Sequence, residues 1–149
     1  MQDKSSRNDA ILNRLRKLLS EQQKKFEAYI RCLKLESVSI QEDDAEKLNN
    51  QTLIEKEILS EIIRLQRVIE PLEELYSRNI PAGTPELNRL RKAVTEMRSA
   101  AASLNLENRN RIRERLSSLR TEISGLRIPK NRRSPYSNLG RPAMLDMTT

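Results

Sequence analysis

Apolar residues recur at alternating steps of three and four along most of this chain. This spacing places them on one face of an α-helix. Comparable stripes run through Ile11–Leu33 and Leu87–Leu126. The pattern predicts an all-α protein of three long antiparallel amphipathic helices, packed as a coiled-coil-like bundle. The clearest stripe lies in the middle of the chain and consists of Ile58, Ile62, Leu65, Ile69, Leu72 and Tyr76.

A polar stretch near residue 40 marks the first expected boundary between helices. Ser39 followed by Glu42 fits a capping box, in which both side chains bind free backbone N–H groups at a helix start. The two aspartates that come next favour the positive end of a new helix. We therefore expect a first helix over about 5–38 and a second over about 40–77.

Prolines mark the other expected features of the helices. Pro71 falls inside the second helix, where we expect a kink because the apolar stripe continues past it. Thr84 and Pro85 supply a cap and a first-turn proline. They predict a third helix over 85–126, which ends close to a glycine at residue 125.

Charge follows the same division of the chain. The net charge is +7 overall, with +4 over residues 1–39, −5 over 40–83, +4 over 84–126 and +4 over 127–149. An acidic second helix between two basic ones favours a bundle, residues 1–126, in which the second helix contacts both others. The last segment, 127–149, contains three prolines and is predicted to be an extended, flexible and basic C-terminal tail.

Composition argues against an enzyme. The chain has no histidine, which excludes a Ser–His or Cys–His nucleophile pair. Its single cysteine, Cys32, cannot form an internal disulfide, and we interpret it as a small residue packed beside the first stripe rather than a reactive thiol. The three glycines match no phosphate-binding loop. We expect no catalytic residues, no cofactor and no metal site.

The chain shows neither a secretory signal nor a membrane-spanning segment. Its first ten residues are polar, and no apolar run approaches the length of a transmembrane helix. We therefore expect a soluble cytoplasmic protein that does not insert into a membrane.

The last turns of the third helix are the candidate binding site. At 1.5 Å per residue, the second helix spans roughly 55 Å and the third roughly 60 Å or more. If the third helix runs back along the second, its final turns extend past it and their apolar face lacks a partner. This face is the predicted cargo-binding surface: Leu116, Leu119, Ile123 and Leu126, with Ile128 as a flanking anchor.

Three asparagines interrupt the third stripe upstream of this face. Asn105, Asn108 and Asn110 fall where the step from one apolar residue to the next misses a heptad position. Polar residues in a helix interface weaken it but can fix its register.

Three local patterns carry a resemblance to a known family. The first is an N-terminal amphipathic helix and a polar break that lead into Leu53-Ile-Glu-Lys-Glu-Ile-Leu59. The second is the asparagine-bearing stretch Leu104-Asn-Leu-Glu-Asn-Arg-Asn110. The third is Pro135-Tyr-Ser-Asn-Leu-Gly140, followed by Met144-Leu-Asp146. Together they resemble the flagellar type III export chaperones for the hook–filament junction proteins, the FlgN-like family.

The resemblance implies a specific function. Such a protein binds the C-terminal helical segments of flagellar hook-associated proteins, prevents their premature self-association and delivers them to the flagellar export gate. Unassembled coiled-coil ends expose apolar faces, which a helical chaperone can cover by packing helix against groove. Tyr136, an aromatic residue in a tail with no core to join, is the predicted contact with the export gate.

Two other interpretations stay open at this point. A structural coiled-coil or adaptor protein without a secretion client has the same helical pattern. Nucleic-acid binding is favoured by the basic tail, but no interleaved aromatic residues or recognition motif support a specific interaction. The helical pattern fits a monomer and an oligomer equally well. The basic residues of the tail include Lys130, Arg132, Arg133 and Arg141.

Overall fold

The computed structural model describes residues 2–80 and 83–126. Within these ranges the chain forms three α-helices and no strand: α1 (Gln2–Gln41), α2 (Ala45–Asn79) and α3 (Pro85–Leu126). The predicted all-α fold is therefore confirmed. None of the described helices combines the length and apolar character needed to cross a bilayer. The predicted tail, 127–149, lies outside the described residues.

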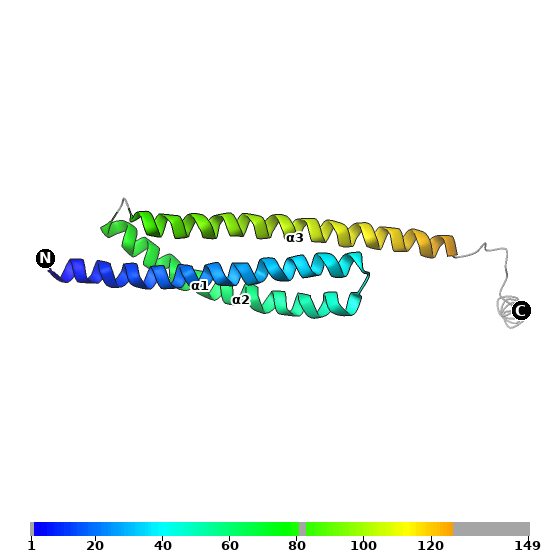
Figure 1. Ribbon diagram of the computed structural model, residues 1–149, viewed down its shortest axis with the longest axis horizontal. Helices are drawn as coiled ribbons and strands as arrows, with labels where there is room; N and C mark the ends of the chain where they lie inside the picture. Colours follow the sequence, from blue (N-terminus) through cyan, green and yellow to red (C-terminus); the bar gives the residue numbers. More distant parts are fainter. Residues whose placement is uncertain (1, 81–82, 127–149) are drawn as a thin grey trace, which may run out of the picture. The chain divides into compact units, whose positions relative to one another are not determined.

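The chain divides into two compact units, Met1–Arg111 and Ile112–Thr149. The first unit contains α1, α2 and residues 85–111 of α3. Figure 1 shows these three helical segments lying side by side. Of the second unit the structure describes residues 112–126, which form the rest of α3.

Polar contacts establish the directions of the helices in the first unit. Between α1 and α2, and between α2 and α3, residue numbers rise in one helix as they fall in the other, so each pair is antiparallel. α1 and α3 consequently run parallel to each other. The contacts that show this are Gln22–Gln66 and Tyr29–Glu55, Arg91–Glu73 and Arg98–Gln66, and Arg16–Glu86 and Asn108–Leu33.

The core of the first unit is built from the predicted stripes. In α2, Ile62, Ile69 and Tyr76 are buried. The other members of its stripe, Ile58, Leu65 and Leu72, are partly buried and pack against the core. The stripe of α2 shares one core with apolar residues of α1 and α3. The other buried apolar members of the core are Leu15, Leu18, Leu19, Phe26, Tyr29, Leu33, Leu87, Val94 and Ala101.

The turn between α1 and α2 lies later than the sequence predicts, and the proposed capping box is wrong. Ser39 stays inside α1, where its buried Oγ lies 2.9 Å from Oε1 of Gln51. α1 ends instead at Gln41. In the turn that follows, Asp43 adopts a left-handed conformation with φ 55°, and the N–H of Asp44 donates to the Ser39 carbonyl oxygen (3.0 Å). Asp44 is the true cap of α2, since its carboxylate accepts from the Lys47 N–H (3.1 Å).

The second boundary agrees with the sequence pattern. α3 begins at Pro85, and Oγ1 of Thr84 accepts a hydrogen bond from the Leu87 N–H (3.3 Å). Gly83 precedes this cap with φ 65°, a conformation that a side chain would strain. Pro71 does not end α2, which continues to Asn79. Figure 1 shows that the green C-terminal part of α2 runs in a different direction from its cyan part.

Ion pairs in the first unit follow the predicted charge pattern. Glu61 of α2 pairs with Lys25 of α1, and Glu73 of α2 pairs with Arg91 of α3 at 3.0 Å. The acidic helix therefore contacts a basic residue on each neighbour. Because these side chains are partly exposed, each pair adds only about 0.2–1 kcal/mol, and their main effect is to favour this pairing of helices.

Candidate functional site

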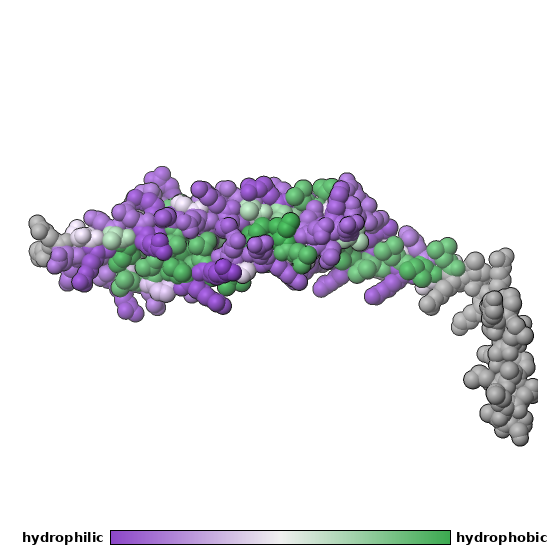
Figure 2. Space-filling model, turned by 90° about the horizontal axis from the view of Figure 1, so that it is seen from below, coloured by the Kyte–Doolittle hydropathy of each residue, from purple (hydrophilic) through white to green (hydrophobic). Residues whose placement is uncertain are grey.

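The described part of the second unit carries a row of exposed apolar side chains on one face of α3. Leu116, Leu119, Ile123 and Leu126 are 49%, 36%, 55% and 74% exposed. Figure 2 shows hydrophobic surface, in green, on this last part of α3. We call these four residues the exposed stripe. Ile128, the predicted flanking anchor, lies outside the described residues.

The exposed stripe continues the face of α3 that is buried upstream. Val94 and Ala101 are buried in the first unit. Ile112 follows Val94 by 18 residues in the sequence, which is five helical turns at 3.6 residues per turn. Ile112 therefore has the same angular position on the helix as Val94, and the exposed stripe follows from Ile112 at steps of four and three. One helical face is thus covered in residues 87–108 and exposed after residue 112.

Charged residues border the exposed stripe on both sides, but unequally. Arg113 and Arg120 lie on one flank, seven residues apart, and both are exposed. Within residues 2–80 and 83–126 neither forms an ion pair. On the other flank Arg115 pairs with Glu122 at 3.7 Å. The first flank is therefore basic, whereas the second carries one positive and one negative side chain that pair with each other.

A cluster of buried polar side chains lies near the end of α1 in the first unit. Asn108 is buried and its Nδ2 donates to the Leu33 carbonyl oxygen at 2.8 Å. Glu36 is also buried, and its Oε1 has no hydrogen-bond partner among the described residues. Burial raises the pKa of Glu36 well above its usual range, and the nearby Glu55 carboxylate raises it further, while the Asn108 amide opposes the shift.

Cys32 lies beside this cluster and behaves as a packing residue. Its side chain is buried and Sγ lies 3.3 Å from the Gln51 carbonyl oxygen. Burial raises the pKa of the Cys32 thiol to about 11, with smaller contributions from the carboxylates of Glu36 and Glu55. A thiol with so high a pKa is almost entirely protonated at neutral pH and is a poor nucleophile. This agrees with the interpretation of Cys32 from the sequence.

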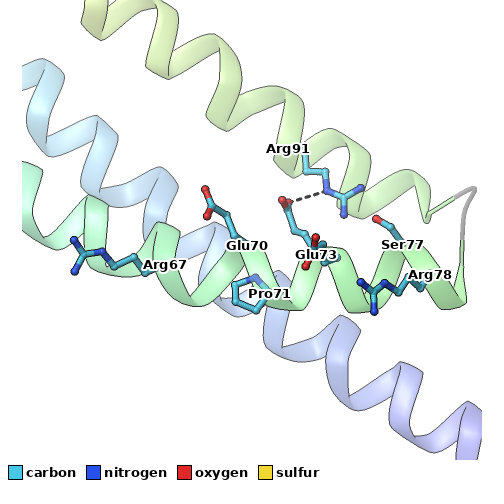
Figure 3. Close-up of a pocket in the computed structure, with 8 residues that line it drawn as sticks. Arg67, Glu70, Pro71, Glu73, Ser77, Arg78 and Arg91 are labelled. Atoms are coloured by element: carbon cyan, nitrogen blue, oxygen red, sulfur yellow. Dashed lines mark hydrogen bonds and ion pairs between the residues drawn. The ribbon is translucent and has the colours of Figure 1, made fainter.

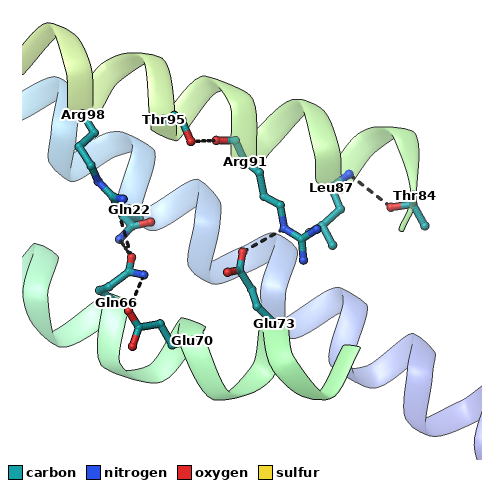
Figure 4. Close-up of polar contacts among 9 residues, drawn as sticks. All are labelled: Gln22, Gln66, Glu70, Glu73, Thr84, Leu87, Arg91, Thr95 and Arg98. Carbon is teal, nitrogen blue, oxygen red and sulfur yellow. Dashed lines mark hydrogen bonds and ion pairs between the residues drawn. The ribbon is translucent and has the colours of Figure 1, made fainter. Parts of the chain in front are cut away.

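A second polar network crosses the middle of the bundle (Figure 4). Gln22 is almost fully buried, and its Nε2 donates to Oε1 of Gln66 at 2.8 Å. Arg98 donates to the same oxygen at 3.3 Å and its guanidinium lies 5.8 Å from the centre of the Phe26 ring. Gln66 in turn donates to Glu70 at 3.1 Å. The buried amide group of Gln22 is therefore hydrogen-bonded, in contrast to Oε1 of Glu36.

A groove of about 920 Å³ is lined mainly by the C-terminal half of α2 (Figure 3). Its lining mixes three arginines with three glutamates, and the ion pair between Arg91 and Glu73 crosses it. The mixed charges give the groove no strong preference for either sign of ligand. In the described part of the chain, no three His, Cys, Asp or Glu side chains are grouped to hold a metal ion. The groove is lined by Arg67, Glu70, Pro71, Glu73, Glu74, Ser77, Arg78 and Arg91.

A protein of Treponema pallidum (strain Nichols), described as uncharacterized, is 32% identical to this chain over 104 residues. The match covers 70% of this chain and 67% of that protein. The two proteins belong to one family. No family model matches the chain, and no solved structure matches it.

The structure places four of the six predicted site residues on one face, and Ile128 and Tyr136 lie outside the described residues. The sequence interpretation missed the basic flank of the exposed stripe, although the seven-residue spacing of Arg113 and Arg120 places them on one side of a helix. The buried polar residues Gln22 and Glu36 were also missed. Both occupy positions that the spacing of the first stripe assigns to its apolar face, which was the available signal.

Proposed function

We propose that this chain is a cytoplasmic export chaperone that binds helical segments of flagellar hook-associated proteins. In this proposal it keeps those segments from associating prematurely and delivers them to the flagellar type III export gate. The observation that carries it is the exposed stripe, Leu116 to Leu126, on a helix whose upstream face is used for packing. The resemblance to the FlgN-like family supplies the class of client.

The physical basis of the proposal is helix-on-helix packing. Four large apolar side chains on one face are an incomplete helix interface. A client helix that covers them removes apolar surface from water, which stabilises the complex by about 25 cal/mol for each Å² buried. The same contact occupies the client's own apolar face, so that face is not available for premature assembly.

Co-expression with a hook-junction protein tests the proposal. The wild-type chain should copurify with the client in a stoichiometric complex, and the double substitution Ile123→Asp and Leu126→Asp should abolish it. Because both residues are exposed, far-UV helicity should stay near the wild-type value.

A matched control adds the same two charges to the opposite face of the same helix. Ser117→Asp with Thr121→Asp should leave the complex intact, because both residues point away from the exposed stripe. Binding that survives Ile123→Asp with Leu126→Asp would place the client surface elsewhere. If the wild-type chain forms no complex at all, a structural coiled-coil role replaces the chaperone role.

The proposal assigns Tyr136 a separate task, docking the loaded chaperone on the export gate. Tyr136→Ala should leave client affinity unchanged and reduce both hook-protein export and motility. Asn138→Ala, a neighbouring change in the same segment, is the control and should leave export unchanged. Normal export by Tyr136→Ala would eliminate the docking role.

A further inference from the structure

The charged residues that border the exposed stripe carry information about its partner. We infer that the stripe accepts an amphipathic helix with acidic residues beside its apolar face, and that it does not pair with a second copy of this chain. The inference rests on the proposed helix-binding function and narrows the chemistry of the client. It is carried by the positions and pairing of the four charged residues next to the stripe.

One border of the stripe is uniformly basic. Arg113 and Arg120 are exposed and seven residues apart, so they lie two turns apart along one side of α3. In paired helices, residues at these flanking positions meet the flanks of the partner and determine which partner and which orientation are preferred. A partner with Glu or Asp along the facing flank would pair with both arginines.

The opposite border contributes much less to selectivity. There Arg115 and Glu122 pair with each other at 3.7 Å, with side chains 38% and 60% exposed. Their charges partly cancel before any partner binds. The preference for an acidic partner therefore comes from the border that carries Arg113 and Arg120.

Pairing with a second copy brings like charges together in either orientation. In an antiparallel pair, equivalent flanks meet, so Arg113 and Arg120 of one chain face the same residues of the other. In a parallel pair, Arg120 of one chain faces Arg115 of the other. Like-charge contacts of this kind suppress the wrong partner.

Two designed peptides of equal length test the inference with the full chain. Both form helices with the same Leu and Ile stripe, and one carries Glu at the flanking positions where the other carries Lys. Fluorescence anisotropy should give about tenfold tighter binding of the Glu peptide at low salt. The difference should shrink as salt rises, since the screening length is about 10 Å at 0.1 M ionic strength.

Charge reversal assigns the preference to the two arginines. Arg113→Glu with Arg120→Glu should make the Lys peptide the tighter ligand. The control, Arg89→Glu with Lys92→Glu, makes the same change of charge at exposed positions on the other side of α3 and should keep the preference for the Glu peptide. Ile123→Asp with Leu126→Asp should abolish binding of both peptides.

Three results would overturn the inference: equal affinity for the two peptides, no reversal in the Arg113→Glu and Arg120→Glu chain, or no binding of either peptide. A dimer in sedimentation equilibrium that disappears with Ile123→Asp and Leu126→Asp would also overturn it, because a second copy would then occupy the stripe. If the hook-junction complex still forms in these cases, the proposed function stands and only the charge preference fails. Loss of both the complex and peptide binding rejects both proposals.

Discussion

At the scale of single residues, the bundle is distinguished by polar side chains at positions that the stripes assign to the core. Gln22 is hydrogen-bonded to Gln66, whereas Glu36 has a buried carboxylate oxygen without a partner. A buried carboxyl group without full compensation favours its neutral form. Glu36 therefore lowers the free energy of unfolding at neutral pH.

Replacing Glu36 with Gln should stabilise the protein at neutral pH. The unfolded chain releases the Glu36 proton near the ordinary pKa of 4.5, but the native state keeps it to higher pH. Between these two pKa values the native state binds more protons, so the free energy of unfolding falls as pH rises above 4.5. Denaturant unfolding at pH 7 should show Glu36→Gln to be more stable by about 1 kcal/mol, with no gain at about pH 4.

Glu21→Gln is the matched control for this prediction, because Glu21 lies in the same helix and is exposed. It should leave both the stability and its pH dependence unchanged. A loss of stability at neutral pH in Glu36→Gln would mean that the native bundle prefers the charged form of Glu36.

Asn108 is the asparagine of the third helix that the structure singles out. Its amide donates to the Leu33 carbonyl oxygen from a buried position, while Asn110 is exposed. Asn108→Ala should lower the free energy of unfolding by about 1–3 kcal/mol, because the Leu33 carbonyl oxygen loses this bond and a small cavity forms. Asn110→Ala should change it by less than about 0.5 kcal/mol. Thermal unfolding measures both variants, and an equal loss of stability in Asn108→Ala and Asn110→Ala would contradict a stabilising role for the buried Asn108 amide.

At the scale of helices, the end of α1 is set by packing against α2 rather than by the first polar residue in the sequence. Ser39 has the right side chain for a cap, but its hydroxyl is buried against α2. Ile40 is buried as well, so α1 gains apolar contacts by continuing past Ser39. The left-handed Asp43 then lies in the turn, and Asp44 caps α2.

Asp44 should therefore contribute to stability as a helix cap. Asp44→Ala should reduce the free energy of unfolding by about 1 kcal/mol, because the Lys47 N–H loses its acceptor. Asp44→Asn keeps an acceptor at the same place and should retain most of that stability. Urea denaturation of the two variants checks this, and an equal loss in both would point to the charge of Asp44 rather than to its hydrogen bond.

At the scale of the whole molecule, one long helix takes part in two different environments. Residues 85–111 of α3 contribute to the core of the first unit, whereas residues 112–126 expose their apolar face. Local stability in proteins follows buried apolar contacts. The two parts of α3 should therefore differ in how readily they open.

Amide hydrogen exchange should resolve this difference. Amides of residues 91–108 should exchange slowly, with protection near that of the core residues of α1, while those of residues 112–126 should exchange faster by at least about tenfold. When a client is added and binds, exchange should slow mainly in residues 112–126. Uniform protection along the whole of α3 in the free chain would contradict the division into a packed part and an exposed part.

Much of this architecture could be predicted from hydrophobic spacing. The stripe from Ile58 to Tyr76 predicts α2, and the cap at Thr84 predicts the start of α3. The net charges of the segments predict that α2 contacts both other helices, as its ion pairs with Lys25 and Arg91 show. Apolar spacing, a helix cap and the net charge of a segment all depend on residues that are close together in the sequence, so they can be recognised without the fold. The predicted client face is likewise a property of the spacing along α3, and its role remains a prediction.

The sequence by itself determined that the chain forms three amphipathic helices, because the period of the apolar residues and the charge of each segment are properties of the sequence alone. Only the tertiary structure decided where α1 ends, which asparagine is buried and which polar core residues find partners. Ser39, Asn108 and Glu36 each depend on atoms of a different helix: Gln51, Leu33 and Glu55. Such contacts join residues far apart in the chain, and no local spacing encodes them.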